Sequence, residues 1–274
     1  MDSLILPWLS HIKTLLHGAC NISEHVASGE SVLVQEGSDN DSVVQILSLA
    51  QILLDPYYRT IEGIFYTHPR KTSNSKKKGF AVLVEKDWIA FGFPFARRMG
   101  QFFDKKKNTD EISPIFLQFL DSVWQIWRKF PTRFEFNEQF LTFIARHYYS
   151  SRFGTFIDNN EKERRAAVKT KTISIWTQVT VERKRFSNVY YEKEENPLPL
   201  KPDLEVVLRK SYYLFWNQQL SVYRQKVSIQ VKARARTSSL SRVALDISGI
   251  FLEFSLEFSF VIFFNNNNII FFYL

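Results

Sequence analysis

The sequence has a single cysteine, Cys20, among its 274 residues. One cysteine cannot close an intrachain disulfide, which argues against a small secreted domain held together by disulfide bonds. Its scarcity also limits covalent chemistry, because a cysteine-dependent phosphatase needs a thiolate at the start of its phosphate loop and an arginine at the end. Val26 stands six residues after Cys20, so the sequence contains no Cys-x5-Arg motif. We interpret Cys20 as a buried structural thiol.

Signals for export, membrane insertion and nucleic-acid binding are missing as well. The first eight residues lack a basic region followed by a long apolar core, so we expect a cytoplasmic protein, with peripheral attachment to endomembranes as an alternative. Glu253 and Glu257 interrupt the aromatic run at residues 250–264, which leaves stretches too short for a membrane span. No zinc-ligand spacing or helix-turn-helix signature is present, so nucleic acid is not an expected partner.

The charge is strongly basic, with a formal net value of +8 at pH 7. Much of it comes from short runs at residues 68–71, 76–78, 105–107 and 223–236. Such runs are usually solvated loops, but together they make an anionic membrane surface a candidate partner. The apolar content of 45% is enough for one large core.

A strand, a loop and a helix between residues 31 and 54 form the most informative pattern. Residues 31–34 predict a buried strand, and residues 43–54 predict an apolar helix. In this arrangement backbone N–H groups gather at the helix N-terminus, where they can cradle a phosphate. The loop itself consists of Gln35, Glu36, Gly37, Ser38, Asp39, Asn40, Asp41 and Ser42.

The residues of this loop are unsuited to phosphoryl transfer. Three carboxylates, on Glu36, Asp39 and Asp41, would each repel a phosphate dianion, at a cost on the order of several kcal/mol in a partly desolvated site. The run Asp39-Asn40-Asp41 superficially resembles calcium ligands, but the later glycine and the twelfth-position glutamate of a calcium loop are missing. We therefore predict no catalytic residue, no cofactor and no metal here, and expect Asp41 or Ser42 to cap the following helix.

Five sequence blocks carry a specific resemblance to a known family. They are LAQILLDPYYRTIEG (49–63), LVEKDW (83–88), PIFLQFLDSVW (114–124), FEFNE (134–138) and FGTF (153–156). In this order they resemble the myotubularin family of phosphoinositide 3-phosphatases, and the resemblance extends over roughly residues 8–219, most of the chain. The stretch 153–164 and the cysteine-free loop most resemble the inactive members of the myotubularin-related protein nine type.

The resemblance makes the loop a degenerate version of an active one. Active members read His-Cys-Ser-Asp-Gly-Trp-Asp-Arg, which places the histidine on Gln35, the nucleophile on Glu36 and the phosphate-binding arginine on Ser42. Only Asp41 matches. The resemblance also implies a lipid-binding domain and the first half of the phosphatase domain before this sequence, and a coiled coil at its end. Residues 225–274 show no heptad pattern for that coiled coil.

Apolar periodicity predicts further helices at residues 9–16, 80–91, 114–130 and 138–149. Asp55-Pro56 should end the helix that follows the loop. The tryptophans Trp88, Trp124 and Trp127 are expected in the core. Residues 64–79 interrupt the family pattern with a Ser-, Asn- and Lys-rich insert, which we interpret as a disordered basic surface loop or as retained intron sequence.

The predicted fold class is α/β: a truncated cysteine-phosphatase-like domain in which a strand, a phosphate-loop-like turn and a helix precede a mostly helical half. We expect this domain over residues 1–220 and an atypical, strand-prone tail over residues 221–274. The first functional hypothesis is an inactive pseudophosphatase that pairs with an active myotubularin acting on phosphatidylinositol 3-phosphate or the 3,5-bisphosphate. The alternatives are an active phosphatase and a non-catalytic module that binds phosphoinositides or membrane surfaces.

Overall fold

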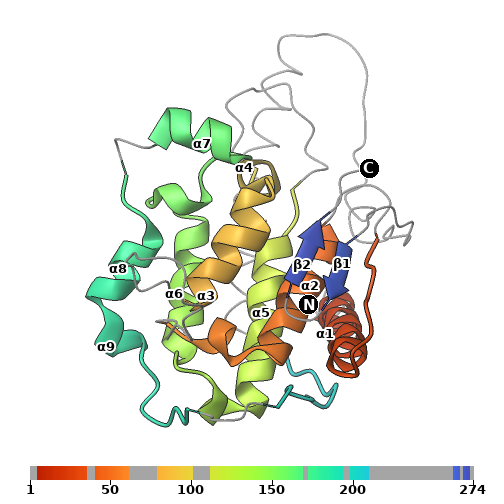
Figure 1. Ribbon diagram of the computed structural model, residues 1–274. Helices are drawn as coiled ribbons and strands as arrows, with labels where there is room; N and C mark the ends of the chain where they lie inside the picture. The colour runs from red at the N-terminus through yellow and green to blue at the C-terminus, as the bar shows by residue number, and fades with distance from the viewer. Residues whose placement is uncertain are drawn as a thin grey trace, which may run out of the picture.

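The computed structural model describes residues 5–35, 41–61, 79–100, 112–168, 172–193, 198–209, 262–265 and 268–271. Over this part the chain is mostly helical (Figure 1). The α-helices are α1 (Ile5–Ala27), α2 (Asp41–Leu54), α3 (Gly79–Leu83), α4 (Phe95–Arg98), α5 (Ile115–Lys129), α6 (Glu138–Tyr148), α7 (Glu161–Val168), α8 (Ile175–Val181) and α9 (Arg183–Phe186). Short 3-10 turns are η2 (Pro56–Arg59), η5 (Pro131–Arg133) and η6 (Gly154–Phe156), and the π-helical η3 (Val84–Ala90) continues α3.

Helices α1 and α2 pack on each other and on α5. The apolar face predicted at residues 9–16 lies on α1, and the helix extends well beyond it at both ends. Trp8 at its start is almost fully buried, and its indole N–H donates to the carboxylate of Asp121 on α5 at 2.7 Å. This bond fixes one end of α1 to the central helix, because a buried indole N–H is costly to leave without a partner.

The predicted helices of the middle of the chain are confirmed. Helix α2 ends at Leu54, and Asp55 caps the turn η2 by accepting from the N–H of Tyr57. The helix predicted at residues 80–91 is formed by α3 and η3, and the two predicted at 114–130 and 138–149 are α5 and α6. Trp88 of η3 donates to the hydroxyl of Ser48 on α2 at 3.0 Å, which ties the π-helical segment to the helix after the loop.

The core between these helices is unusually aromatic. Its fully buried aromatic side chains include Phe80, Trp88, Phe95, Phe116, Phe119, Phe134, Phe136, Phe140, Tyr148, Phe156 and Phe186. Many of the rings meet edge to face, the arrangement that aromatic quadrupoles favour. Of the three tryptophans expected in the core, only Trp88 is fully buried. Trp124 and Trp127 are half-buried, and each contacts a later part of the chain. The guanidinium of Arg209 lies over the ring of Trp124, and the indole N–H of Trp127 donates to the carbonyl of Phe136.

The buried strand predicted at residues 31–34 is not formed. These residues are extended, with one isolated bridge position at Leu33, and they alternate between half-buried and exposed side chains. Leu33 is 47% exposed. A strand is stabilised by hydrogen bonds to a neighbouring strand, and the part of the chain described here places no strand beside this segment. The α/β character of the predicted fold is therefore not confirmed.

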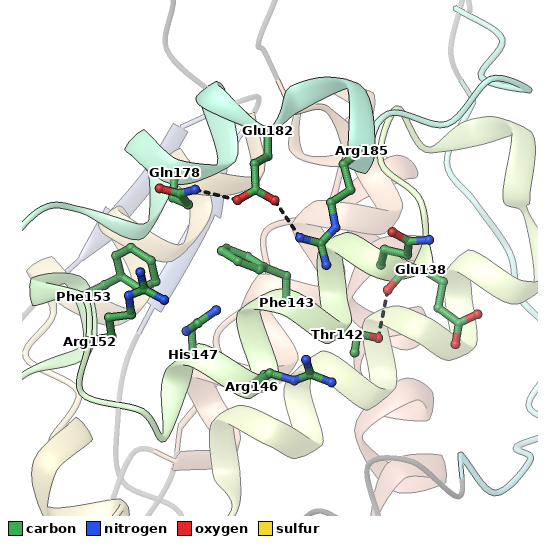
Figure 2. Close-up of a pocket in the computed structure, with 11 residues that line it drawn as sticks. Glu138, Thr142, Phe143, Arg146, His147, Arg152, Phe153, Gln178, Glu182 and Arg185 are labelled. Carbon is green, nitrogen blue, oxygen red and sulfur yellow. Dashed lines mark hydrogen bonds and ion pairs between the residues drawn. The ribbon is translucent and has the colours of Figure 1, made fainter.

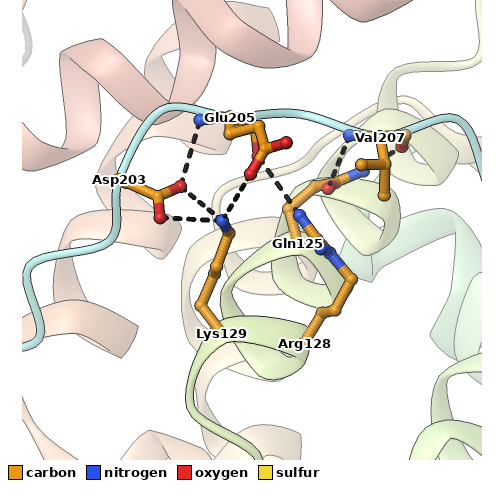
Figure 3. Close-up of polar contacts among 6 residues, drawn as sticks. All are labelled: Gln125, Arg128, Lys129, Asp203, Glu205 and Val207. Atoms are coloured by element: carbon orange, nitrogen blue, oxygen red, sulfur yellow. Dashed lines mark hydrogen bonds and ion pairs between the residues drawn. The ribbon is translucent and has the colours of Figure 1, made fainter.

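Residues 198–209, which we call the strap, cross the outer side of α5 (Figure 3). Gln125 of α5 makes a reciprocal pair of bonds with the backbone of Val207, donating to its carbonyl at 2.8 Å and accepting from its N–H at 3.2 Å. Lys129 binds the carboxylates of Asp203 and Glu205 in the strap. The strap thus satisfies its backbone groups partly through side chains of a helix.

The tail contains an antiparallel pair of strands, β1 (Ile262–Asn265) and β2 (Asn268–Phe271), with Ile262 opposite Phe271. This agrees with the strand-prone character predicted for the tail. Residues 64–78 of the predicted insert and most of the tail lie outside the described residues, so their predicted disorder and domain boundaries stay predictions. Gly79, the last residue of the insert predicted at 64–79, is instead buried as the first residue of α3, because its lack of a side chain lets its backbone pack against Tyr57 of η2. Within the described ranges, no helix combines the length and apolar character that a membrane span requires.

Candidate functional site

The described residues include only the two ends of the degenerate loop, Gln35 on one side and Asp41 and Ser42 on the other. Gln35 is exposed, and Glu36, Gly37, Ser38, Asp39 and Asn40 lie outside the described residues. Helix α2 begins at Asp41, so Asp41 and Ser42 belong to its first turn. The helix predicted to start at Val43 thus begins two residues earlier, and Asp41 lies inside the helix that it was expected to cap. An acidic residue in the first turn still suits the positive end of the helix dipole.

The carboxylate of Asp41 forms a two-contact ion pair with Arg98 of α4. Arg98 Nη2 lies 2.9 Å from Asp41 Oδ2, and Arg98 Nε lies 3.3 Å from Asp41 Oδ1. Both residues are at most 7% exposed. This fork geometry is the strong form of an arginine–carboxylate contact. Asp41 of the loop therefore holds α4 against the start of α2.

The sequence analysis did not single out Arg98. Asp41 and Arg98 are 57 residues apart, and residues 62–78 between them belong largely to the insert. No local spacing links the two side chains. The only signal was a second basic residue beside Arg97, and a pair of arginines on a four-residue helix does not reveal which one is buried.

Tyr148 of α6 lies close to this ion pair, near enough for the charges of Asp41 and Arg98 to act on its hydroxyl. Its ring is fully buried against Phe95, Phe116 and Phe156, with centroid distances of 5.1–5.9 Å. Burial, followed by the nearby Tyr149 and Asp41, raises the pKa of Tyr148 well above its usual value. Its hydroxyl is therefore neutral at physiological pH, and it cannot serve as an anionic nucleophile.

Cys20 cannot take the place of the missing nucleophile. It lies on α1 and is half-buried. Burial, followed by repulsion from Glu24, raises the pKa of Cys20 to about 11, so the thiol stays protonated near neutral pH. Metal-assisted chemistry has no visible site either, because the described residues contain no group of three or more His, Cys, Asp or Glu side chains placed to hold a metal ion.

A hollow of about 410 Å³ lies elsewhere, between α6, α8 and α9 (Figure 2). Its lining includes Arg146, His147, Arg152 and Arg185, which come from three separate segments of the chain. The sequence analysis did not predict this hollow, because its basic residues do not form a run.

Comparison with known proteins identifies the kind of domain to which these helices belong. A family model described as a myotubularin-like phosphatase domain matches residues 5–67 and 74–165. Helices α1 to α6 therefore form part of a phosphatase-like domain, which supports the predicted cysteine-phosphatase-like fold in its broad outline. The chain belongs to the myotubularin-related family.

Individual relatives agree with this assignment. The chain is 43% identical over 217 residues to myotubularin of Xenopus laevis, which covers 78% of this chain and 33% of that protein. It is 40% identical over 214 residues to the phosphatidylinositol-3,5-bisphosphate 3-phosphatase MTMR2 of Mus musculus, covering 77% and 31%. A probable serine/threonine-protein kinase, pats1 of Dictyostelium discoideum, is 44% identical over 186 residues, covering 67% of this chain and 5% of that protein.

The chain thus spans about a third of the length of the curated myotubularins that it matches. The finer likeness to the inactive protein-nine type is not tested by these relatives and stays a prediction.

Proposed function

We propose that this chain is a catalytically inactive myotubularin, a pseudophosphatase that regulates an active phosphoinositide 3-phosphatase by associating with it. The observation that carries the proposal is the composition of the loop. Glu36 occupies the position of the nucleophilic cysteine, and Ser42 occupies that of the phosphate-binding arginine. Phosphoryl transfer through a covalent intermediate needs both an anionic nucleophile and preorganised cationic donors.

The geometry around the loop supports inactivity. Arg98 lies near the start of α2, but its guanidinium is engaged by Asp41 through two contacts. A phosphate that recruited Arg98 would have to separate it from the buried carboxylate of Asp41, which is costly. The thiol of Cys20 lies on another helix and is protonated.

The proposed substrate of the active partner follows from the family. A relative with 40% identity carries the name phosphatidylinositol-3,5-bisphosphate 3-phosphatase, so we infer that the regulated reaction is removal of the 3-phosphate from phosphatidylinositol 3-phosphate or the 3,5-bisphosphate. The proposed location is the cytoplasm, with peripheral association with endomembranes, where such lipids present their headgroups.

The test measures phosphate release from both lipids by the purified chain, alone and mixed with an active myotubularin. We expect no release by the chain alone and a changed rate in the mixture. A partner inactivated at its own nucleophile serves as the control, because it should abolish release in the mixture. Turnover by the chain alone would overturn the proposed inactivity, and an unchanged rate in the mixture would overturn the regulatory role.

A second candidate function is non-catalytic binding to an anionic membrane, which the net charge of +8 favours. Neutralising Lys76, Lys77 and Lys78 should then weaken binding to anionic vesicles but not to phosphatidylcholine vesicles. Equal binding by the neutralised variant would remove this basic run from consideration.

A further inference from the structure

The hollow beside α6 is built from two parallel rows of side chains. Thr142 and Arg146 form one row, and Phe143 and His147 form the other, because residues four apart lie on the same face of a helix. The opposite wall comes from the end of α8 and from α9, and Arg152-Phe153 lies at the end near His147 (Figure 2).

Two arginines of this hollow carry charges that the described residues do not neutralise. Arg146 and Arg152 are both exposed, and neither has a carboxylate within ion-pair distance in the described part of the chain. The guanidinium of Arg152 lies 5.8 Å from the centre of the Phe153 ring. A guanidinium group that has no carboxylate partner offers several unused N–H donors in a planar fork, and this geometry matches the oxygens of phosphate.

The other charges of the hollow are balanced locally. Glu182 accepts from Arg185 at 2.7 Å and from the side-chain amide of Gln178 at 2.5 Å. Glu138 accepts from Arg209 of the strap at 3.0 Å. After these pairs are counted, Arg146 and Arg152 leave a local excess of two positive charges. A phosphate monoester carries about −1.5 to −2 at neutral pH, whereas one carboxylate would balance only half of the excess.

An apolar wall lies beside the positive charges. The imidazole of His147 is held between the rings of Phe143 and Phe153, at centroid distances of 4.4 and 5.0 Å. Phe143 and Phe153 are at most 8% exposed. This packing limits the rotational freedom of the imidazole and so holds His147 in the lining of the hollow.

We infer that the hollow between α6, α8 and α9 binds the phosphate group of a small phosphorylated molecule or headgroup, with Arg146 and Arg152 as the main contacts. The inference goes beyond the proposed function, since it involves neither the degenerate loop nor an active partner. The ligand chemistry is a phosphate monoester on a compact polar body, either free in solution or exposed at a membrane surface.

His147 should make ligand affinity at this site depend on pH. Burial, then the positive charges of Arg152 and Arg146, lower the pKa of His147, while Glu182 opposes this and Arg185 reinforces it. A bound phosphate would reverse the repulsion and raise the pKa of His147. Binding would then be coupled to proton uptake by His147, so the affinity of the wild type relative to His147→Gln should increase as the pH falls from the raised pKa of the bound histidine toward the lower pKa of the free one. Comparing the two proteins cancels the titration of the phosphate itself, which gains a proton at about pH 6.

The test titrates the full chain with inorganic phosphate, with inositol 1,3-bisphosphate, and with phosphatidylcholine vesicles that contain or lack phosphatidylinositol 3-phosphate. We expect Arg146→Ala and Arg152→Ala each to weaken binding about tenfold, as for loss of one charge-assisted contact, and the double variant to lose measurable binding. Lys13→Ala is the control, because Lys13 is an exposed cation of α1. Helix α1 lies on the other side of the described helices from α8 and α9 (Figure 1).

Two further measurements separate binding from misfolding. Thermal melts should match the wild type, since both arginines are exposed. In wild-type protein the imidazole resonances of His147 should shift on ligand addition, and the ratio of wild-type to His147→Gln affinity should increase as the pH falls. Binding of the inositol phosphate alone would assign a soluble ligand, and binding of the doped vesicles alone would assign a lipid headgroup. No binding of any probe, or undiminished binding by the double arginine variant, would overturn the inference.

Discussion

Arg98 and Asp41 form a buried ion pair with two contacts, at 2.9 and 3.3 Å, that joins α4 to the first turn of α2. The pair occupies the place where the degenerate loop meets its helix. Asp41, which the sequence analysis placed in the loop, is thus part of the packing between two helices. The same ion pair stabilises the domain and, in the proposed function, keeps the guanidinium of Arg98 from binding a phosphate.

Removing one member of the pair should destabilise the domain strongly. Arg98→Ala leaves the carboxylate of Asp41 buried without its cation, and we expect a loss of about 3–5 kcal/mol in the free energy of unfolding. The double variant Asp41→Asn, Arg98→Met should lose less, because no charge is then buried. Urea denaturation measures both, with Arg97→Ala as the exposed control on the same helix. A double variant less stable than Arg98→Ala would contradict this account.

Restoring the two missing catalytic residues should not restore turnover. In Glu36→Cys, Ser42→Arg the loop would still carry Gln35, Asp39 and Asn40, and Asp41 would still be engaged by Arg98. We expect no phosphate release from phosphatidylinositol 3-phosphate in a full-length background. Alkylation rates of the new cysteine across pH should show whether a thiolate forms. Turnover near that of an active relative would mean that the rest of the loop is competent.

Asp121 should make the stability depend on pH. Burial, outweighing the bonds from Trp8 and Gln125, raises the pKa of Asp121 from 3.8 to about 6. The folded state therefore holds this proton more tightly than the unfolded state, so its contribution to stability is present below pH 4 and is lost as the pH rises to about 6. Asp121→Asn should be more stable than wild type above pH 7, by on the order of 2 kcal/mol, with the gain shrinking toward pH 4. Parallel stability curves for the two proteins would disprove this.

The strap should depend on Gln125 more than on its ion pairs. Gln125→Ala removes both bonds to the backbone of Val207, and we expect a loss of about 1–2 kcal/mol. Hydrogen exchange at the Val207 amide should accelerate in the same variant. Lys129→Ala breaks only contacts to the exposed carboxylates of Asp203 and Glu205, so it should change little. The reverse order of effects would show that the surface charges hold the strap.

The helices of the domain were predictable because their signal is local. Apolar residues at helical spacing marked α5 and α6, and Asp55-Pro56 marked the end of α2. The family also follows from residue identities alone, and so does the absence of cysteine and arginine from residues 35–42. These properties need no knowledge of which segments meet.

The prediction of a buried strand at residues 31–34 was wrong, because a strand does not form from local preference alone. The sequence shows which residues favour an extended backbone, but a strand also needs a neighbour to accept and donate its hydrogen bonds. Among the described residues no strand supplies that neighbour, and Leu33 stays largely exposed. The local preference was present, but the only sign of pairing for this segment among the described residues is the isolated bridge position at Leu33.

By itself, the sequence determined that the chain carries a myotubularin-like loop without a cysteine or an arginine, followed by a set of amphipathic helices. Only the tertiary structure decided that Asp41 is bound to Arg98, that residues 198–209 form a strap over α5, and that Arg146 and Arg152 share one hollow. Each of these depends on segments distant in the chain. Their meeting is set by how the aromatic core packs the helices, and no local pattern of residues records that packing.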